Sequence, residues 1–185
     1  MKFSFCFFLA LVFLTGFTAP GPKLKQTKIT DAVSVLLPGD FSVMPDDAIA
    51  AKYPAPRKPL GAFTSPNGQV DFIVSERPST FKKEDLVMLK AFYRSAITNK
   101  YSKVNFIQEE VKQVNKHDFI SFEFTSTVVD EEKRTNKLAP IRRYTFIQYT
   151  IVNDKLLIFT FNAPIDLQQL WQPTARKMMQ SIKLS

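Results

Sequence analysis

The sequence predicts an α+β fold, an antiparallel sheet of about six to seven strands with helices on both faces. Three successive segments, residues 118–129, 141–152 and 155–163, are rich in Val, Ile, Thr, Tyr and Phe and alternate with a period of two, as strands do. Two other segments, near residues 83–99 and 166–182, space their apolar residues as helices do. One face of the predicted sheet is oily and the other half-oily, so layers are expected on both sides.

Composition and charge describe one globular domain with a basic surface. The chain has 185 residues, 45% of them hydrophobic, with 18 Phe and 1 Trp. Its formal net charge is +8, which becomes +7 if a leader containing Lys2 is removed. The excess of cations invites an anionic partner, but the basic residues are scattered along the chain. The basic residues can therefore be interpreted either as a solvated surface or as a functional electrostatic patch.

The N-terminal segment has the features of a secretory signal peptide. It contains one lysine, an apolar run that begins at Phe3, and small residues up to Ala19. Pro20 hinders a cut after Ala19, so Thr18 is an equal candidate for the cleavage point. An uncleaved membrane anchor is the alternative, although the apolar run is just short of a spanning helix.

The predicted organisation has three parts: residues 1–19 as the signal peptide, residues 20–28 as a basic linker, and residues 29–185 as a single α+β domain. The only cysteine, Cys6, lies in the leader. The mature chain would then have neither disulfides nor thiol chemistry.

The first half of the domain is predicted as short strands around one small helix. The expected elements are a strand at 29–37, a short continuation at 41–44, helical turns at 48–51, a proline-rich loop at 53–59, and a hairpin of 60–64 with 70–76. The turn of that hairpin is Pro66-Asn67-Gly68.

The second half is predicted to begin with the best helix, residues 83–99, capped by Ser79 or Thr80. One apolar stripe is assigned to it: Leu86, Leu89, Tyr93, Ala96 and Ile97. A strand at 104–114 and a turn at 115–118 lead to the meander, whose first two strands are joined by a charged loop at 130–140.

A terminal helix is predicted to start at a capping pair of Asp166 and Gln169. Its apolar positions include Leu170, Met178 and Ile182, and the methionines are assigned to the core. Pro173 is expected to kink this helix or restart it, because proline lacks an amide hydrogen.

The meander predicts two sheet faces of different character. The turn at Asn153-Asp154 would set Thr150 opposite Leu157, and the longer loop is expected to bring Phe124 near Phe146. The oily face would then hold Ile120, Phe122, Phe124, Phe146, Thr150, Val152, Leu157, Phe159 and Phe161. The mixed face would hold Ser121, Glu123, Thr125, Thr127, Arg143, Thr145, Ile147, Tyr149, Ile151, Leu156, Ile158 and Thr160. Any site is sought on the mixed face.

Catalytic and cofactor signals are weak. His117 is the only histidine and is expected in an exposed turn, which leaves a catalytic triad or a His-rich metal site without support. Adjacent carboxylates such as Glu109-Glu110 diverge on a strand and form no acid/base dyad. Five scattered glycines form no phosphate-binding loop. No catalytic residue, metal or cofactor is assigned.

Four residues of the mixed face are the candidate ligand-binding residues: Glu123, Thr125, Arg143 and Tyr149. Glu123 lies between two phenylalanines, and a buried carboxylate needs a partner or a proton, so Arg143 is expected to pair with it. The pair is either structural or part of a ligand site.

The order of elements resembles the PsbP-like superfamily, which includes photosystem extrinsic subunits, a eukaryotic Ran-binding protein and DcrB-type envelope proteins. The local similarities are Leu36-Leu37-Pro38-Gly39-Asp40-Phe41, the long helix before the meander, and Leu170-Trp171 running into Ser181-Ile182-Lys183-Leu184. The resemblance implies an α/β/α sandwich and a non-enzymatic role in protein interaction or complex assembly. It carries over no functional residue, and the lipid-attachment cysteine of DcrB-type members is absent.

These observations predict an exported, non-catalytic domain of the periplasm, the cell envelope or the extracellular space. Its expected partner is an unknown protein or an anionic surface, without nucleic acid, and with membrane contact only if the leader is an uncleaved anchor. The alternative is a small-ligand-binding protein or a hydrolase that uses the sheet face around Glu123 and Arg143.

Overall fold

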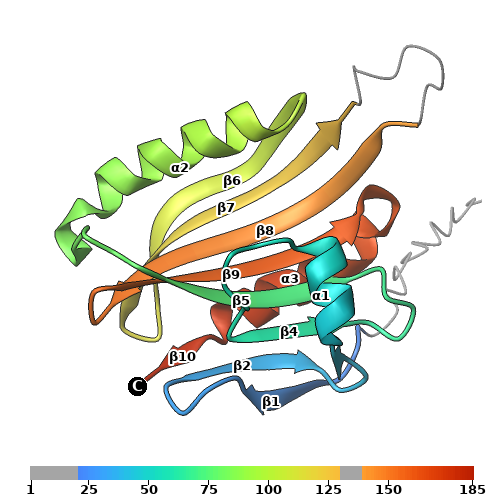
Figure 1. The fold of residues 1–185 in the computed structure, drawn as a ribbon, viewed down its shortest axis with the longest axis horizontal. Coiled ribbons are helices and arrows are strands. Elements are labelled where there is room, and N and C mark those ends of the chain that lie inside the picture. Colours follow the sequence, from blue (N-terminus) through green and yellow to red (C-terminus); the bar gives the residue numbers. More distant parts are fainter. Residues whose placement is uncertain (1–20, 130–138) are drawn as a thin grey trace, which may run out of the picture.

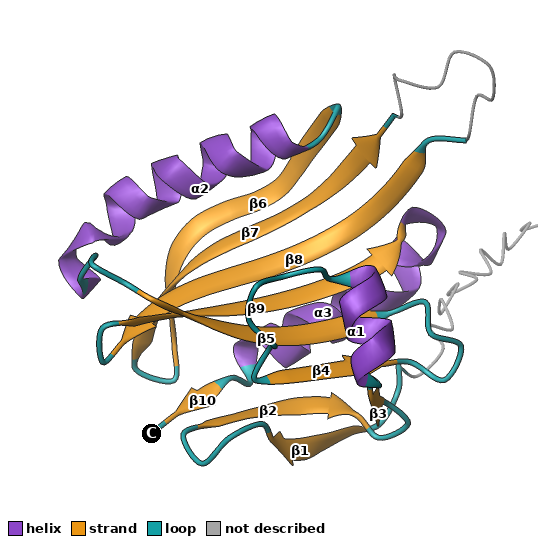
Figure 2. Cartoon of the chain, viewed as in Figure 1, coloured by secondary structure: helices purple, strands orange, loops and turns teal. Residues whose placement is uncertain are grey.

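A computed structural model describes residues 21–129 and 139–185 of the chain. The predicted signal peptide and most of the charged loop lie outside these residues, so the predictions made for them are not addressed. The described chain folds around one large sheet, and its α-helices separate runs of one to four strands (Figures 1 and 2).

The large sheet has seven antiparallel strands in the order β3-β4-β5-β9-β8-β7-β6. Their bounds are β3 Ser42–Val43, β4 Gly61–Thr64, β5 Asp71–Pro78, β6 Lys103–Val114, β7 His117–Val128, β8 Ile141–Val152 and β9 Lys155–Pro164. The predicted meander and the predicted hairpin are both present in it, with edges that differ by one or a few residues.

Helices cover both faces of this sheet, as predicted for an α+β sandwich. On one face lie α1 (Asp46–Lys52) and α2 (Leu86–Lys100), the latter preceded by a single 3₁₀ turn at Lys83–Asp85. On the other face lies α3 (Gln168–Gln180), preceded by a 3₁₀ turn at Ile165–Leu167.

A small three-stranded sheet shares the α3 face. Its order is β1-β2-β10, with β1 at Leu24–Lys28, β2 at Val33–Pro38 and β10 at Lys183–Leu184. Strand β1 occupies residues that the sequence analysis treats as a linker. It pairs along its whole length with β2, because its backbone satisfies the outer edge of that strand.

Each face of the large sheet has its own hydrophobic core. Under α3, Phe72, Phe146 and Phe161 pack with Met178 and Met179, and the assignment of the methionines to the core is confirmed. Under α2, Leu89 packs on Phe122 and Phe124. Full burial of one such side chain contributes about 1.5–3 kcal/mol, so these two layers hold the helices on the sheet.

The tight hairpin between β8 and β9 has the predicted turn and register. Asn153 and Asp154 adopt φ values of 51° and 58°, which these side chains tolerate. Thr150 lies opposite Leu157, as expected. A two-residue turn fixes register because it leaves no slack in the chain.

The predicted register between β7 and β8 is wrong by one residue. Phe124 lies opposite Thr145, and Glu123 lies opposite Phe146. The connection at residues 129–140 is too long to set the register, and a shift of one residue moves every side chain of a strand to the other face. Ile120, Phe122 and Phe124 therefore face α2, while Ser121, Glu123 and Thr125 face α3.

A restart of the helix at Pro173 is wrong, since α3 runs as one helix from Gln168 to Gln180, whereas the alternative, a kink at Pro173, stays a prediction. The residues after Pro173 bury Thr174, Ala175, Met178 and Met179 against the sheet. That burial outweighs the one backbone hydrogen bond that proline removes. The predicted capping pair is not formed, because no side chain caps either the 3₁₀ turn or α3.

Candidate functional site

The four predicted ligand-binding residues do not share a face of the sheet. Glu123 and Thr125 project from β7 toward α3, whereas Arg143 and Tyr149 project from β8 toward α2. The sheet separates the two pairs, so they cannot form one site. A ligand-binding role for any of them stays a prediction.

Glu123 is fully buried and is held by side chains from β8 and α3. The Tyr144 hydroxyl donates to Oε1 over 2.9 Å, and the Arg176 Nε donates to Oε2 over 3.0 Å. Gln172 donates from Nε2 to Oε1 as well. The partner expected from the sequence, Arg143, is wrong because the register places it on the opposite face.

This arrangement holds α3 in place from within the core. Burial, followed by the negative charge of Glu123, raises the pKa of Tyr144 well above its ordinary value, so its hydroxyl stays a neutral donor. With three donors satisfying one carboxylate, the cluster has the features of a structural lock.

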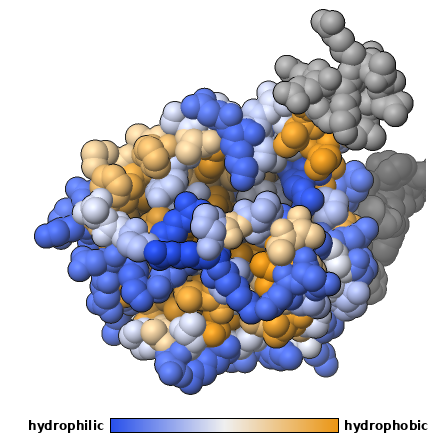
Figure 3. Space-filling view, viewed as in Figure 1, coloured by the Kyte–Doolittle hydropathy of each residue, from blue (hydrophilic) through white to orange (hydrophobic). Residues whose placement is uncertain are grey.

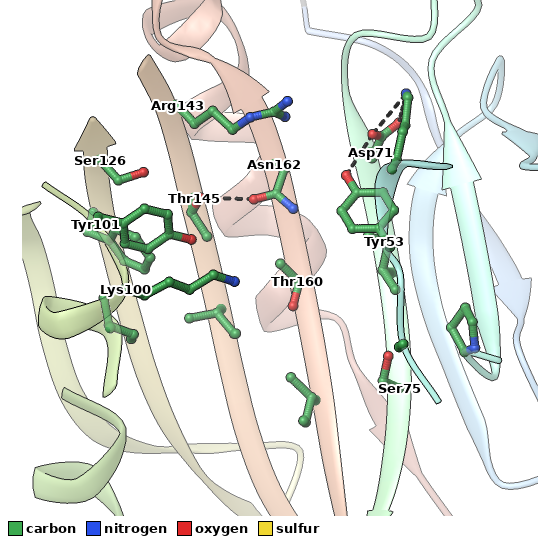
Figure 4. Close-up of a pocket in the computed structure, with 18 of the residues that line it drawn as sticks. Tyr53, Asp71, Ser75, Lys100, Tyr101, Ser126, Arg143, Thr145, Thr160 and Asn162 are labelled. Carbon is green, nitrogen blue, oxygen red and sulfur yellow. Dashed lines mark hydrogen bonds and ion pairs between the residues drawn. The ribbon is translucent and has the colours of Figure 1, made fainter. Parts of the chain in front are cut away.

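A large cavity lies on the α2 face, where the helices leave part of the sheet uncovered. We call it the α2-face groove; its volume is about 1100 Å³. Its floor is formed by β5, β9, β8 and β7. The C-terminal half of α2 forms one wall, and the end of α1 with the following proline-rich loop forms the other (Figures 1 and 4).

The lining of the α2-face groove is strongly basic. Six cationic side chains line it, Lys52, Arg57, Arg77, Lys100, Arg142 and Arg143, together with a single acidic residue, Asp71. Among the residues that the structure describes, only Lys52 of these six is paired with a carboxylate. Figure 3 shows strongly hydrophilic atoms across the middle of this face. A low-dielectric concave wall concentrates such a positive potential.

At one end of the groove, polar groups converge over β8 and β9 (Figure 4). Arg143 reaches across from β8, and Lys100 reaches over the floor from α2. The hydroxyl of Tyr101 points the same way. Thr145 donates to Oδ1 of Asn162 over 2.9 Å, and a hydrogen bond from the Asn162 side chain to Tyr53 partly offsets the raised pKa of that phenol.

The positive charge of Arg143 acts on a tyrosine from each wall at this end. Burial raises the pKa of Tyr101, while the positive charge of Arg143 opposes the shift. Burial and the hydrogen bond to Asp71 likewise raise the pKa of Tyr53, and Arg143 again opposes them. Both phenols therefore stay protonated at neutral pH and can donate hydrogen bonds.

The wall formed by α1 is anchored by Asp71. The Tyr53 hydroxyl donates to it over 2.7 Å and the Thr64 hydroxyl over 2.6 Å, while Lys52 lies 3.1 Å away. Asp71 is buried, so its charge is balanced within this cluster. The acid shapes the groove and is not free to bind a ligand.

The other end of the groove is aromatic and aliphatic. Tyr93 of α2 stacks on Tyr149 with ring centroids 4.0 Å apart and an interplanar angle of 10°. Beside this pair the floor presents Ile147 and Ile158, both only half-buried. These isoleucines also pack against the hydrophobic cluster under α2.

The outward side of α2 is also apolar, which the single stripe assigned from the sequence does not anticipate. Val87, Met88 and Phe92 are 77%, 56% and 60% exposed, and we call these three residues the outer apolar face of α2. Figure 3 shows hydrophobic surface over this helix. Lys90 and Arg94 instead bind Glu109 of β6.

Potential metal ligands within residues 21–129 and 139–185 include the single histidine of the chain. No group of three or more His, Cys, Asp or Glu side chains there could hold a metal ion. His117 is half-buried at the start of β7. Over the same residues, no helix has the length and apolar character needed to cross a bilayer.

Sequence reasoning misses most of the residues that build these features. Lys100 and Tyr101 are separated from Arg143 by two strands, and Gln172 and Arg176 are far in sequence from Glu123. The one available signal is the mixed face of β8 and β9, since Thr145, Ile147, Tyr149, Ile158 and Thr160 do line the groove.

Comparison with known proteins gives matches in structure alone. No protein-family model matches the sequence, and no curated protein matches it either. The cyanobacterial PsbP (CyanoP) of Synechocystis sp. PCC 6803 superposes with a TM-score of 0.59 at 16% identity, covering 91% of this chain and 96% of that one.

Two further solved structures have the same arrangement. LpqN, described as involved in cell envelope biogenesis of Mycobacterium tuberculosis, gives a TM-score of 0.56 at 8% identity and covers 88% of this chain and 91% of that one. The Ran-binding protein Mog1p of Saccharomyces cerevisiae gives 0.58 at 14%, covering 89% and 96%. At such identities the likeness shows the fold alone. The chain has the PsbP-like fold, as its sequence predicts.

Proposed function

We propose that this chain is an exported, non-catalytic domain that binds another protein, and that the outer apolar face of α2 is its contact surface. The observation that carries the proposal is the exposure of Val87, Met88 and Phe92 on consecutive turns of one helix. A helix on a monomer normally turns polar side chains outward, and contiguous exposed apolar side chains mark contact surfaces.

Two further observations support a binding role. The buried carboxylates Asp71 and Glu123 are each held by hydrogen-bond donors of the chain itself. Of the three similar structures, one is called a Ran-binding protein and one is assigned to cell envelope biogenesis. Export itself rests on the N-terminal sequence.

Affinity purification after cross-linking in cells that make the protein tests this proposal. A paired variant, Met88→Ser with Phe92→Ser, is expected to lose a partner that the unchanged protein recovers, while its urea midpoint stays the same because both side chains are exposed.

Leu170→Ser is the matched control, since Leu170 is 59% exposed but lies on α3, on the opposite face of the sheet. The control is expected to retain the partner. Recovery of no partner above background, or equal recovery with the α2 variant, would count against the proposal.

A further inference from the structure

The α2-face groove has two chemically different ends along one line. The line follows β8 from Arg143 to Tyr149, which at about 3.3 Å per residue spans roughly 20 Å. The first end carries Arg143, Lys100 and Tyr101, and the second carries Ile147, Ile158 and the Tyr93–Tyr149 stack. An occupant must match both ends.

The polar end is built from hydrogen-bond donors. A lysine offers three donors and an arginine five, and neither can accept. The protonated phenol of Tyr101, which points the same way, adds another donor. Neither Lys100 nor Arg143 has a carboxylate partner in residues 21–129 and 139–185. Such a cluster selects an anionic group and disfavours a cation or a neutral polar group.

The apolar end requires an occupant that removes Ile147 and Ile158 from water. The volume of about 1100 Å³ is larger than a simple inorganic ion needs and is comparable to pockets for small organic ligands. Covering these half-exposed isoleucines removes apolar area from water, so an apolar body adds affinity there.

The backbone of the floor argues against an extended peptide as the occupant. Strands β5, β9 and β8 are paired with each other along the groove, so their amides and carbonyls are already bonded within the sheet. A peptide lying on this face would find no strand edge to pair with, and its own amides would be poorly satisfied.

From this geometry we propose that the α2-face groove binds an amphiphilic organic anion. Its phosphate, sulfate or carboxylate group lies between Lys100 and Arg143, and its apolar body lies along Ile147, Ile158 and Tyr149. This site is separate from the outer apolar face of α2, so it goes beyond the proposed protein contact and can be tested without a partner.

Isothermal titration with decyl phosphate, kept below its micelle concentration, tests the proposal. Saturable binding of one molecule per chain is expected. Decanol and decyltrimethylammonium are expected to bind at least about tenfold more weakly, because each lacks the anion that two charged donors would hold. Higher salt is expected to weaken the binding of decyl phosphate, since Lys100 and Arg143 are exposed at the groove mouth and salt screens their charges.

Paired variants locate the site. The double variant Lys100→Gln with Arg143→Gln is expected to bind decyl phosphate at least about tenfold more weakly. Lys82→Gln with Lys183→Gln removes the same charge from exposed positions outside the groove and is expected to leave binding unchanged. Ile158→Thr is expected to bind decyl phosphate about fivefold more weakly, with little change in the binding of inorganic phosphate. Urea midpoints confirm that each variant is folded.

Several outcomes would overturn the proposal. They are the absence of saturable decyl phosphate binding, an equal loss in the control pair, and inorganic phosphate binding as tightly as decyl phosphate, which would mean an anion site only. Binding to phosphatidylglycerol vesicles without binding of free decyl phosphate or decanoate would point to a membrane surface instead. Tighter binding of an acidic peptide than of decyl phosphate would point to a protein segment.

Discussion

The structural role of Glu123 is set by the side chains around it. Its carboxylate is fully buried and accepts hydrogen bonds from Tyr144, Gln172 and Arg176. Arg176 is itself 45% exposed, so in the Glu123–Arg176 ion pair the carboxylate is buried and the arginine is partly hydrated. Removing the carboxylate charge would leave buried donors unsatisfied, and that loss is larger than the net gain from forming the bonds.

We expect Glu123→Gln to lower the free energy of unfolding by about 2–4 kcal/mol, because its amide group would meet the donors of Gln172 or Arg176. Urea unfolding at neutral pH measures this change. Glu109→Gln is the control, since Glu109 pairs with Arg94 at the surface and such pairs contribute about 1 kcal/mol or less. Equal losses in the two variants would contradict a structural lock at Glu123.

The hairpins are the elements whose turns are most closely tied to local sequence. The β8–β9 turn uses Asn153 and Asp154, which accept positive φ. The β6–β7 turn uses Asn115 and Lys116, and Lys116 has φ of 71°. A lysine in this left-handed region is strained by its Cβ, whereas glycine is not.

Lys116→Gly is therefore expected to raise the free energy of unfolding by about 1 kcal/mol. A shift of the urea midpoint to higher concentration, with an unchanged slope, would show it. Lys103→Gly is the matched control, because Lys103 is exposed at the first residue of β6 and has no positive φ for glycine to relieve. Destabilisation by Lys116→Gly would contradict the strain at this turn.

At the scale of the whole molecule, the two faces of the sheet differ in how completely they are covered. The α3 face is closed by a helix and a second sheet, and its core is continuous from β2 to α3. The α2 face is covered only in part, which leaves the groove between α1 and α2. All five tyrosines of the chain lie in these layers, and burial is the main cause that raises the pKa of each.

The absorbance of tyrosinate at alkaline pH measures the pKa values of the tyrosines and so reports on their burial. In denaturant the five tyrosines are expected to titrate near the ordinary value of about 10, and in the native protein all five are expected to titrate higher. Above pH ~10 the native state then binds more protons at its tyrosines than the unfolded state does, so the contribution of the tyrosines to stability is constant below that pH and falls as pH rises above it. Any tyrosine titrating near 10 in the native protein would contradict its burial.

The sequence by itself determines the fold class, most elements, and the β8–β9 register. Period-two and helical spacing are local properties, and the turn at Asn153-Asp154 ties residues that are adjacent in the chain. Tertiary structure alone decides the β7–β8 register, the continuity of α3 through Pro173 and the partner of Glu123. The physical reason is that a long connection leaves the register of β7 to packing against α2 and α3. One residue of shift then places Glu123 under Arg176 and leaves Arg143 in the groove with Lys100.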